Sequence, residues 1–121
     1  RTTGHDLRPG GRLDRSAMAC SAKELLRRGV RRRVVIHAPE LAYAREAEGE
    51  ECWQPAHMVP QVEIASTVGA GDAFTAGICH HWLRGTPLAR TAEAANRYGA
   101  WVATQVGPTP PVPADVLAGV R

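Results

Sequence analysis

The sequence contains no long apolar run, and this absence excludes several classes of protein. None of its apolar stretches approaches the roughly 20 residues that a membrane-spanning helix requires, so we predict no membrane segment and no membrane partner. The segment from Arg1 to Arg15 is polar and rich in glycine, which is not the pattern of a secretory signal. Because the chain also does not start with methionine, we expect it to begin within a longer protein.

Cysteines are few, and their placement does not indicate a disulfide framework. The three residues, Cys20, Cys52 and Cys79, are an odd number at wide spacing. In a chain without an export signal, this pattern favours reduced thiols in the cytoplasm. Neither Cys52 with His57 nor Cys79 with His80 and His81 has the spacing of a tetrahedral zinc site. We therefore predict a cytoplasmic protein and expect surface or core roles for these histidines.

Aromatic residues are missing from the one basic cluster, which contains Arg27, Arg28, Arg31, Arg32 and Arg33. Such a cluster, with a net charge of +3, could indicate a nucleic-acid partner. However, no aromatic side chain is interleaved to stack on a base. Arg27 and Arg28 also fall at the end of a predicted helix, where cations interact favourably with the helix dipole. We therefore predict a solvated helix end and no nucleic-acid partner.

The most informative segment that is present is Ser66–Phe74, with the sequence STVGAGDAF. Gly69, Ala70 and Gly71 lack bulk, so successive backbone N–H groups can converge on an anion at the start of the next helix. Asp72 then lies in the first helical turn, where its carboxylate can accept a proton from a hydroxyl that attacks a bound phosphate. The alternative role for Asp72, an acid stabilised only by the helix dipole, is disfavoured by the flanking glycines. The segment predicts phosphoryl transfer.

Helical and strand patterns follow each other along the chain, which has room for one α/β domain with a mostly parallel sheet. The predicted elements are a helix capped by Ser16 and ending near Arg28, a strand at 34–36, a hairpin of 41–45 with 51–54, a strand end at 62–64, helices at 72–84, 87–104 and 114–120, and an extended loop at 107–113.

Ser66–Phe74 resembles the D-T-x-G-A-G-D-x-F signature of the ribokinase or PfkB family of carbohydrate kinases, and departs from it only at the first position. Ala94-Ala95-Asn96, followed by Gly99-Ala100, Val106-Gly107, Pro110 and Pro113, is similar to the adenine-side helix and closing loop of fructokinase-like members. The resemblance implies a ribokinase-like three-layer α/β/α fold with a mostly parallel sheet. Residues 1–121 would form the C-terminal, nucleotide-binding portion of the kinase domain.

The resemblance also implies an activity: ATP-dependent phosphorylation of a sugar hydroxyl, with a fructose-like sugar as the expected substrate and Mg²⁺ bridging the phosphates. It assigns Asp72 as the catalytic base, places Asn96 beside the adenine ring, and forms the anion hole and ATP site from Gly69, Ala70, Gly71 and Asp72. A monovalent cation, K⁺, would lie near Ser66, Val68 and Gly107. An alternative for Asn96 is a solvated position on the helix surface.

Two departures from the family pattern bear on activity. Ser66 is a neutral hydroxyl where most members have an aspartate, and the segment Ile36–Leu41 replaces a T-x-G-x-x-G loop that approaches the nucleotide. In that segment Pro39 removes a backbone donor and Glu40 adds a negative charge that repels phosphate. The alternative function is therefore a non-catalytic remnant or pseudokinase that acts as a binding domain. Alone, the chain is expected to bind adenine nucleotides weakly or not at all and to phosphorylate no sugar; its oligomeric state and its sugar stay open.

Overall fold

The computed structural model describes residues 3–107 and 111–119. The chain divides into two compact units, Arg1–Trp53 and Gln54–Arg121. Within the described ranges, no helix is both long enough and apolar enough to cross a membrane.

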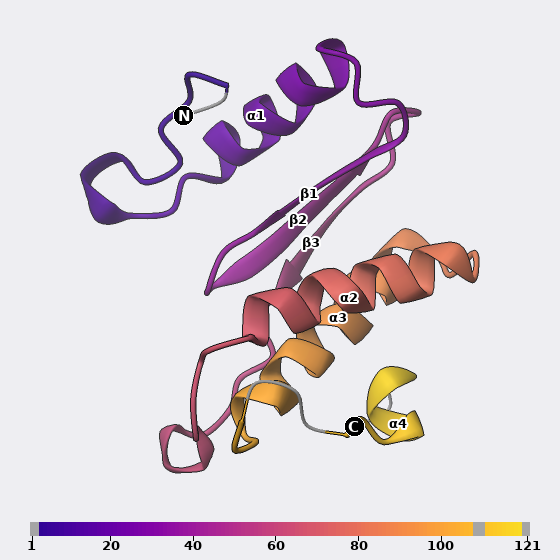
Figure 1. Ribbon diagram of the computed structural model, residues 1–121. Coiled ribbons are helices and arrows are strands. Elements are labelled where there is room, and N and C mark those ends of the chain that lie inside the picture. The colour runs from indigo at the N-terminus through magenta and orange to yellow at the C-terminus, as the bar shows by residue number, and fades with distance from the viewer. Residues whose placement is uncertain (1–2, 108–110, 120–121) are drawn as a thin grey trace. The chain divides into compact units, whose positions relative to one another are not determined.

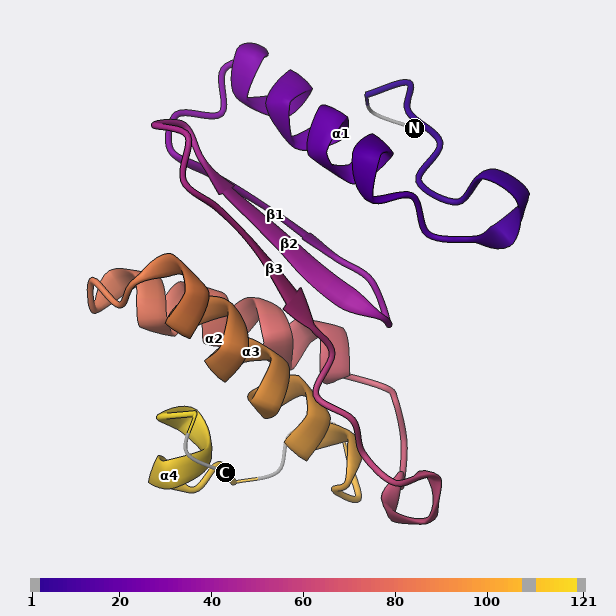
Figure 2. The same cartoon turned by 180° about the vertical axis from the view of Figure 1, so that it is seen from behind.

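The first unit consists of one long helix on a three-stranded sheet. A short 3-10 helix, η1 (Pro9–Gly11), precedes α1 (Arg15–Arg27), and the strands β1 (Arg33–His37), β2 (Leu41–Glu46) and β3 (Glu51–Pro55) follow in the order β1-β2-β3. Figures 1 and 2 show α1 running along the sheet, and its contacts are with β1 and β2. The core of the unit consists of the buried side chains Met18, Ala22, Val34, Leu41 and Tyr43.

Asp14, and not Ser16, caps the amino-terminal end of α1. The Asp14 carboxylate accepts a hydrogen bond from the backbone N–H of Ala17 at 3.1 Å. The backbone of Asp14 is extended, and this conformation brings its side-chain oxygen within reach of the third helical N–H group. The prediction of Ser16 as the cap was wrong, because the helix already begins at Arg15 and Ser16 lies inside its first turn. Gly29, with φ of 113°, lies just beyond the end of α1, as predicted.

The predicted strand at 34–36 and the hairpin across residues 46–50 are both confirmed. In the hairpin turn, the N–H of Glu46 donates to the carbonyl of Glu50 at 2.7 Å. The pairing of β1 with β2 is antiparallel, which differs from the parallel pairing that the helix-to-strand pattern suggested. Only Ala38–Glu40 connects these strands, whereas a parallel pair requires a crossover of about a dozen residues or more.

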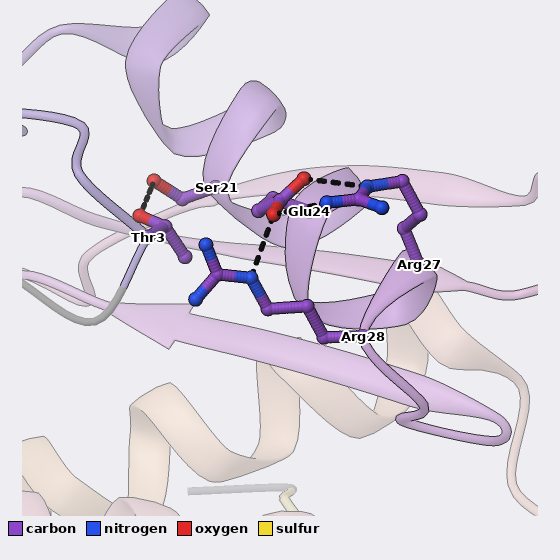
Figure 3. A network of polar contacts seen from close by, with 5 residues as sticks. All are labelled: Thr3, Ser21, Glu24, Arg27 and Arg28. Atoms are coloured by element: carbon purple, nitrogen blue, oxygen red, sulfur yellow. Dashed lines mark hydrogen bonds and ion pairs between the residues drawn. The ribbon is translucent and has the colours of Figure 1, made fainter.

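The arginines at the end of α1 are bound by a carboxylate of their own helix. Figure 3 shows Glu24 accepting hydrogen bonds from Arg27 at 2.9 and 2.8 Å and from Arg28 at 2.6 Å, beside a separate bond between Thr3 and Ser21. The hydrogen bonds from these two guanidinium groups lower the pKa of Glu24 to about 2. The predicted place of Arg27 and Arg28 at a helix end is confirmed, and the absence of a nucleic-acid partner stays a prediction.

In the second unit, two helices pack closely against each other. Helix α2 (Ala70–Leu83) and helix α3 (Leu88–Ala103) lie side by side in Figures 1 and 2, and the short helix α4 (Ala114–Leu117) contacts α3. Gly85, with φ of 71°, ends α2 as predicted. The helix predicted at 87–104 is confirmed as α3, and the apolar residues that recur along it at helical spacing are all buried: Leu88, Ala92, Ala95, Gly99 and Val102.

The strand end expected at 62–64 is wrong, because these residues belong to a turn. Gln61–Glu63 form the 3-10 helix η2, in which Glu63 donates to Pro60 and Ile64 donates to Gln61. The next two N–H groups, of Ala65 and Ser66, donate to the carbonyl of Ala103 at the end of α3. These donors are therefore bound by the turn and by α3 and are not available for a sheet.

The C-terminal helix is shorter than predicted. It ends at Leu117, and a 3-10-type bond from Gly119 to Val116 closes the following turn. Gly119 has φ of 75°, a left-handed conformation that glycine adopts at the end of a helix without steric cost. The predicted end at Val120 and the predicted loop residues 108–110 lie outside the described residues.

The cap of α1 gives a first prediction. Asp14→Ala is expected to lower the free energy of unfolding by about 1 kcal/mol, because an N–H group at the helix start loses its acceptor. Ser16→Ala is the matched control and should change this free energy by less than about 0.5 kcal/mol, as is usual for a surface site. Urea denaturation followed by circular dichroism measures both. A larger effect of Ser16→Ala would show that Ser16 caps the helix after all.

Candidate functional site

The chain enters α2 through a turn that contains a glycine in a left-handed conformation. Gly69 has φ of 85° and ψ of −10° and lies immediately before the helix. Only glycine adopts this conformation without steric cost. Two further bonds shape the turn: Val68 donates to the Ser66 hydroxyl at 3.2 Å, and Ala70 donates to the Thr67 carbonyl at 3.3 Å. The prediction that the loop runs directly into a helix with Asp72 in its first turn is confirmed.

Two backbone donors are open at this helix start. The Ala73 N–H is bonded to the Gly69 carbonyl at 2.9 Å, whereas the N–H groups of Gly71 and Asp72 have no acceptor within the described residues. Gly69 cannot cap them because it has no side chain. Apart from its chain neighbours and the backbone of its own helix, no described heavy atom comes within 4 Å of the position that a Cβ would take on Gly71, so the space beside the turn is open. Unpaired N–H groups at the positive end of a helix dipole form a site for an anion.

Asp72 lies on the same turn as these donors and faces solvent. Its carboxylate forms neither a hydrogen bond nor an ion pair with any residue that the structure describes. The hydroxyl of the nearby Thr75 is bonded to the Gly71 carbonyl at 3.1 Å. Asp72 is thus the one titratable group of the turn, and its oxygens are available to accept a proton.

Asn96 is buried, which excludes the solvated helix position considered as an alternative. It is 6% exposed, and its Nδ2 donates to the carbonyls of Pro55 at 3.0 Å and Gln54 at 3.4 Å. The amide therefore ties the first residues of the second unit to α3. Its Oδ1 accepts no bond from the described residues. Among the described residues, no hydrogen bond joins Asn96 to the turn at Gly69–Asp72, and its placement beside adenine stays a prediction.

A cleft of about 300 Å³ lies along α3, beginning one residue after Asn96. Its walls are mostly apolar, with Trp101 as the largest side chain, and the segment that precedes η2 forms the opposite side. The lining residues are His57, Met58, Val59, Pro60, Glu63, Arg97, Ala100, Trp101 and Thr104. No pattern in the sequence predicted this cleft. The spacing of Arg97, Ala100 and Thr104 on one helix face was the available signal, but residues 57–60 have no periodic pattern to pair with it.

Of the residues assigned to a monovalent cation, Ser66 and Val68 are joined by a hydrogen bond, and the place of Gly107 in such a site stays a prediction. The hydroxyl of Ser66 accepts from Val68, and the N–H of Ser66 lies 3.2 Å from the carbonyl of Ala103. Gly107 is exposed, and no described atom lies within 4 Å of its Cβ position. Ala103 is a neighbour of Ser66 that the sequence did not reveal, because a backbone carbonyl at a helix end leaves no pattern in the sequence.

The segment that replaces the expected glycine loop contains an ion pair. Arg8 donates to both oxygens of Glu40, at 2.8 and 2.6 Å. The hydrogen bond from Arg8 lowers the pKa of Glu40, and that bond raises the pKa of Arg8 in turn. The negative charge of Glu40 is therefore paired within the first unit. Its effect on nucleotide affinity stays a prediction.

Two of the remaining candidate groups have structural roles. His81 is buried, with Nε2 at 2.9 Å from the Leu117 carbonyl and Nδ1 at 3.4 Å from the Thr86 hydroxyl, and so it holds α4 against the end of α2. A core role for this histidine is confirmed. Burial raises the pKa of the Cys52 thiol. Among the described residues, no three His, Cys, Asp or Glu side chains are grouped so that they could hold a metal.

Comparison with known proteins gives a consistent result. The family described as pfkB family carbohydrate kinase matches residues 10–115. The 1-phosphofructokinase of Rhodobacter capsulatus is 42% identical over 62 residues, which are 51% of this chain and 20% of that protein. The ATP-dependent ribose-1-phosphate kinase of Halopiger xanaduensis (strain DSM 18323 / JCM 14033 / SH-6) is 40% identical over 57 residues, which are 47% of this chain and 19% of that protein.

A solved structure supports the fold. Adenosine kinase from Schistosoma mansoni in complex with 2-fluoroadenosine superposes with a TM-score of 0.66 at 21% identity, over 83% of this chain and 31% of that chain. The predicted α/β, ribokinase-like class, as part of a larger domain, is thereby confirmed. The aligned regions span about a fifth of the length of the two curated relatives.

The bonds of Asn96 lead to a second prediction. Asn96→Asp places a carboxylate against two carbonyl oxygens and should lower the free energy of unfolding by about 3 kcal/mol. Asn96→Ala, which removes the donor without adding a charge, should lower it by about 1–2 kcal/mol. Urea denaturation of the three proteins, followed by tryptophan fluorescence, gives the comparison. Wild-type stability of Asn96→Asp would mean that the bonds to Gln54 and Pro55 do not form.

Proposed function

This chain belongs to the pfkB family of carbohydrate kinases, and we propose that it supplies the nucleotide-side part of an enzyme that transfers the γ-phosphoryl group of ATP to a sugar hydroxyl. The observation that carries the proposal is the first turn of α2, where two N–H groups and the carboxylate of Asp72 lie together and none of them has a partner among the residues that the structure describes. Residues 1–121 would be the C-terminal portion of the kinase domain.

The first task of the turn is to hold the transferred phosphoryl group. The N–H groups of Gly71 and Asp72 donate to its equatorial oxygens, and the dipole of α2 adds positive potential at the same point. Gly69 and Ala70 shape the approach, since neither places bulk between the anion and the donors. Each well-aimed donor in such a hole contributes about 3 kcal/mol to lowering the barrier.

Asp72 provides the base. As the sugar hydroxyl oxygen forms a bond to the γ-phosphorus, its proton passes to the Asp72 carboxylate, and the bond from phosphorus to the bridging oxygen breaks so that ADP leaves with the electron pair. The carboxylate is suited to this step because no described residue competes for its oxygens. An aspartate already held by an arginine would be a weaker base.

The base of the nucleotide would bind along α3. The Nδ2 of Asn96 is already bonded to two carbonyls, so only Oδ1 is left to accept from an exocyclic amino group. The cleft along α3 has both apolar and polar lining residues, and Trp101, its largest side chain, offers a planar surface for a ring. We therefore place the adenine ring between Asn96 and this cleft.

Cations would enter with the nucleotide. Mg²⁺ would come with the nucleotide and would supply positive charge at the phosphates, and the described residues of this turn include one carboxylate, Asp72. K⁺ would be held by oxygens near Ser66, Val68 and Gly107, and the Ser66 hydroxyl retains a lone pair beyond its bond from Val68. Both ions would balance negative charge on the phosphates.

The acceptor is proposed to be a fructose-like sugar or its 1-phosphate. The names of both curated relatives refer to sugars with a phosphate at position 1, and those relatives match the chain at 42% and 40% identity.

The role of the base can be tested in an enzyme that joins this chain to the rest of a pfkB kinase domain. Asp72→Asn should lower kcat at least about a hundredfold and leave the Kd for ATP within about twofold, because removal of a base acts on the chemical step. Asp115→Asn is the control, since Asp115 also lies in the first turn of a helix, α4. Its kcat should stay within about twofold. Equal losses of ATP affinity and kcat in Asp72→Asn would make Asp72 structural.

Alone, the chain should bind ATP weakly or not at all and phosphorylate no sugar, because fixed geometry between reactants supplies about 7–11 kcal/mol and the acceptor is not held. In the enzyme that joins this chain to the rest of a pfkB kinase domain, Gly71→Ala should weaken ATP binding at least about tenfold. It should leave stability unchanged or higher, since the added methyl meets no described heavy atom within 4 Å apart from its chain neighbours and the backbone of its own helix. Calorimetry with ATP and assays of ADP release with hexoses, ketoses and sugar phosphates test both statements. Unchanged ATP affinity in Gly71→Ala would favour the non-catalytic alternative.

A further inference from the structure

Helices α2 and α3 approach each other closely at two glycines. On α2, a Cβ at Gly77 would lie 2.9 Å from the Cα of Ala95. On α3, a Cβ at Gly99 would lie 3.0 Å from the carbonyl oxygen of Ala70 and 3.6 Å from the Cβ of Phe74. Glycine is a poor helix former, so a buried glycine inside a helix needs a reason in packing. Both glycines have such a reason, but only Gly99 touches the turn that carries the open N–H groups.

The Gly99 contact acts on the peptide unit that supplies one of those donors. The carbonyl of Ala70 and the N–H of Gly71 belong to the same planar peptide, so they move together and point in opposite directions. A group that presses on the Ala70 oxygen therefore tilts the Gly71 N–H. Resting on the proposed function, we propose that Gly99 is a positioning residue that sets the orientation of the Gly71 N–H for the phosphate.

The packing around Gly99 leaves little space for an added side chain. It is buried on α3 among Ala95, Val102 and Ala103, which are themselves buried. A methyl group at position 99 would have to move the Ala70 carbonyl by a few tenths of an ångström, because 3.0 Å is shorter than an ordinary contact. Hydrogen bonds weaken steeply as their angle departs from linearity, so a small tilt of the peptide reduces the strength of the Gly71 donor.

Gly77 provides a matched control for helix packing. It lies on the same interface, and its Cβ position is 2.9 Å from the nearest atom of α3, compared with 3.0 Å between the Gly99 Cβ position and the Ala70 oxygen. However, Gly77 is seven residues from Ala70 along α2, which is about 10 Å. Gly77→Ala therefore crowds α2 and α3 without pressing on the peptide of Ala70 and Gly71. A role of Gly99 in packing alone would make the two variants behave alike.

The experiment uses this chain joined to the rest of a pfkB kinase domain, labelled with ¹⁵N, and inorganic tripolyphosphate as the anion, with amide spectra recorded during the titration. In the wild type, the shifts should be largest for the amides of Gly71 and Asp72. Gly99→Ala should raise the Kd at least about tenfold, and Gly77→Ala should change it less than about twofold, while both lower Tm. Without anion, Gly99→Ala should displace the Gly71 amide resonance and Gly77→Ala should not.

Each result has a definite reading. Wild-type affinity in Gly99→Ala, or an equal loss of affinity in Gly77→Ala, overturns the inference and leaves the proposed function intact. Absence of anion binding in the wild type overturns the proposed function, and the ligand-free spectra then still decide whether Gly99 sets the Gly71 amide. If Gly99→Ala does not fold, the titration of the wild type tests the inference instead. The amide resonance of Gly99 should then shift when the anion binds, and that of Gly77 should not; any other result overturns the inference.

Discussion

The close packing of α2 on α3 is the constraint on which the site depends. Because Gly77 and Gly99 have no side chains, the backbones of the two helices approach to distances that a Cβ would not allow. The same approach positions the start of α2, since the Ala70 carbonyl lies against Gly99. The unpaired N–H groups of Gly71 and Asp72 are thus part of a packed helix pair and not of a free loop. This arrangement agrees with the general need for anion-binding donors that are oriented before the ligand arrives.

The turn at Ser66–Phe74 could be predicted from the sequence because its chemistry is local. A glycine with positive φ, a helix start and a first-turn carboxylate are all encoded within nine residues. The buried stripe of α3 could also be predicted, since its period follows from helix geometry alone. Contacts between distant segments could not be predicted from the sequence, because the Ala103 carbonyl beside Ser66 and the cleft along α3 depend on tertiary packing. Asp14 replaced Ser16 as the cap because two good capping residues lie two positions apart and only the backbone conformation selects between them.

Two further differences between the predicted and the observed structure also arise from features that sequence patterns do not reveal. Residues 62–64 alternate in polarity like a strand, yet the donors of Glu63 and Ile64 are bound in a 3-10 turn, so hydrogen bonding overrode the pattern. The β1–β2 pair is antiparallel because Ala38–Glu40 is too short for a crossover. In that connection Glu40, which the sequence presents as a free negative charge, is bound by Arg8. Sequence patterns predicted the elements of this chain better than the partners of its charged and polar groups.

In the proposed site, the γ-phosphate of ATP binds at the first turn of α2. A crystal structure of the chain, or of an enzyme that contains it, with a non-hydrolysable ATP analogue would locate this phosphate. We expect γ-phosphate oxygens at hydrogen-bond distance, about 2.7–3.2 Å, from the nitrogens of both Gly71 and Asp72, with the Asp72 carboxylate facing the space beyond the phosphorus. A triphosphate bound elsewhere on the chain, with both N–H groups facing only water, would contradict it.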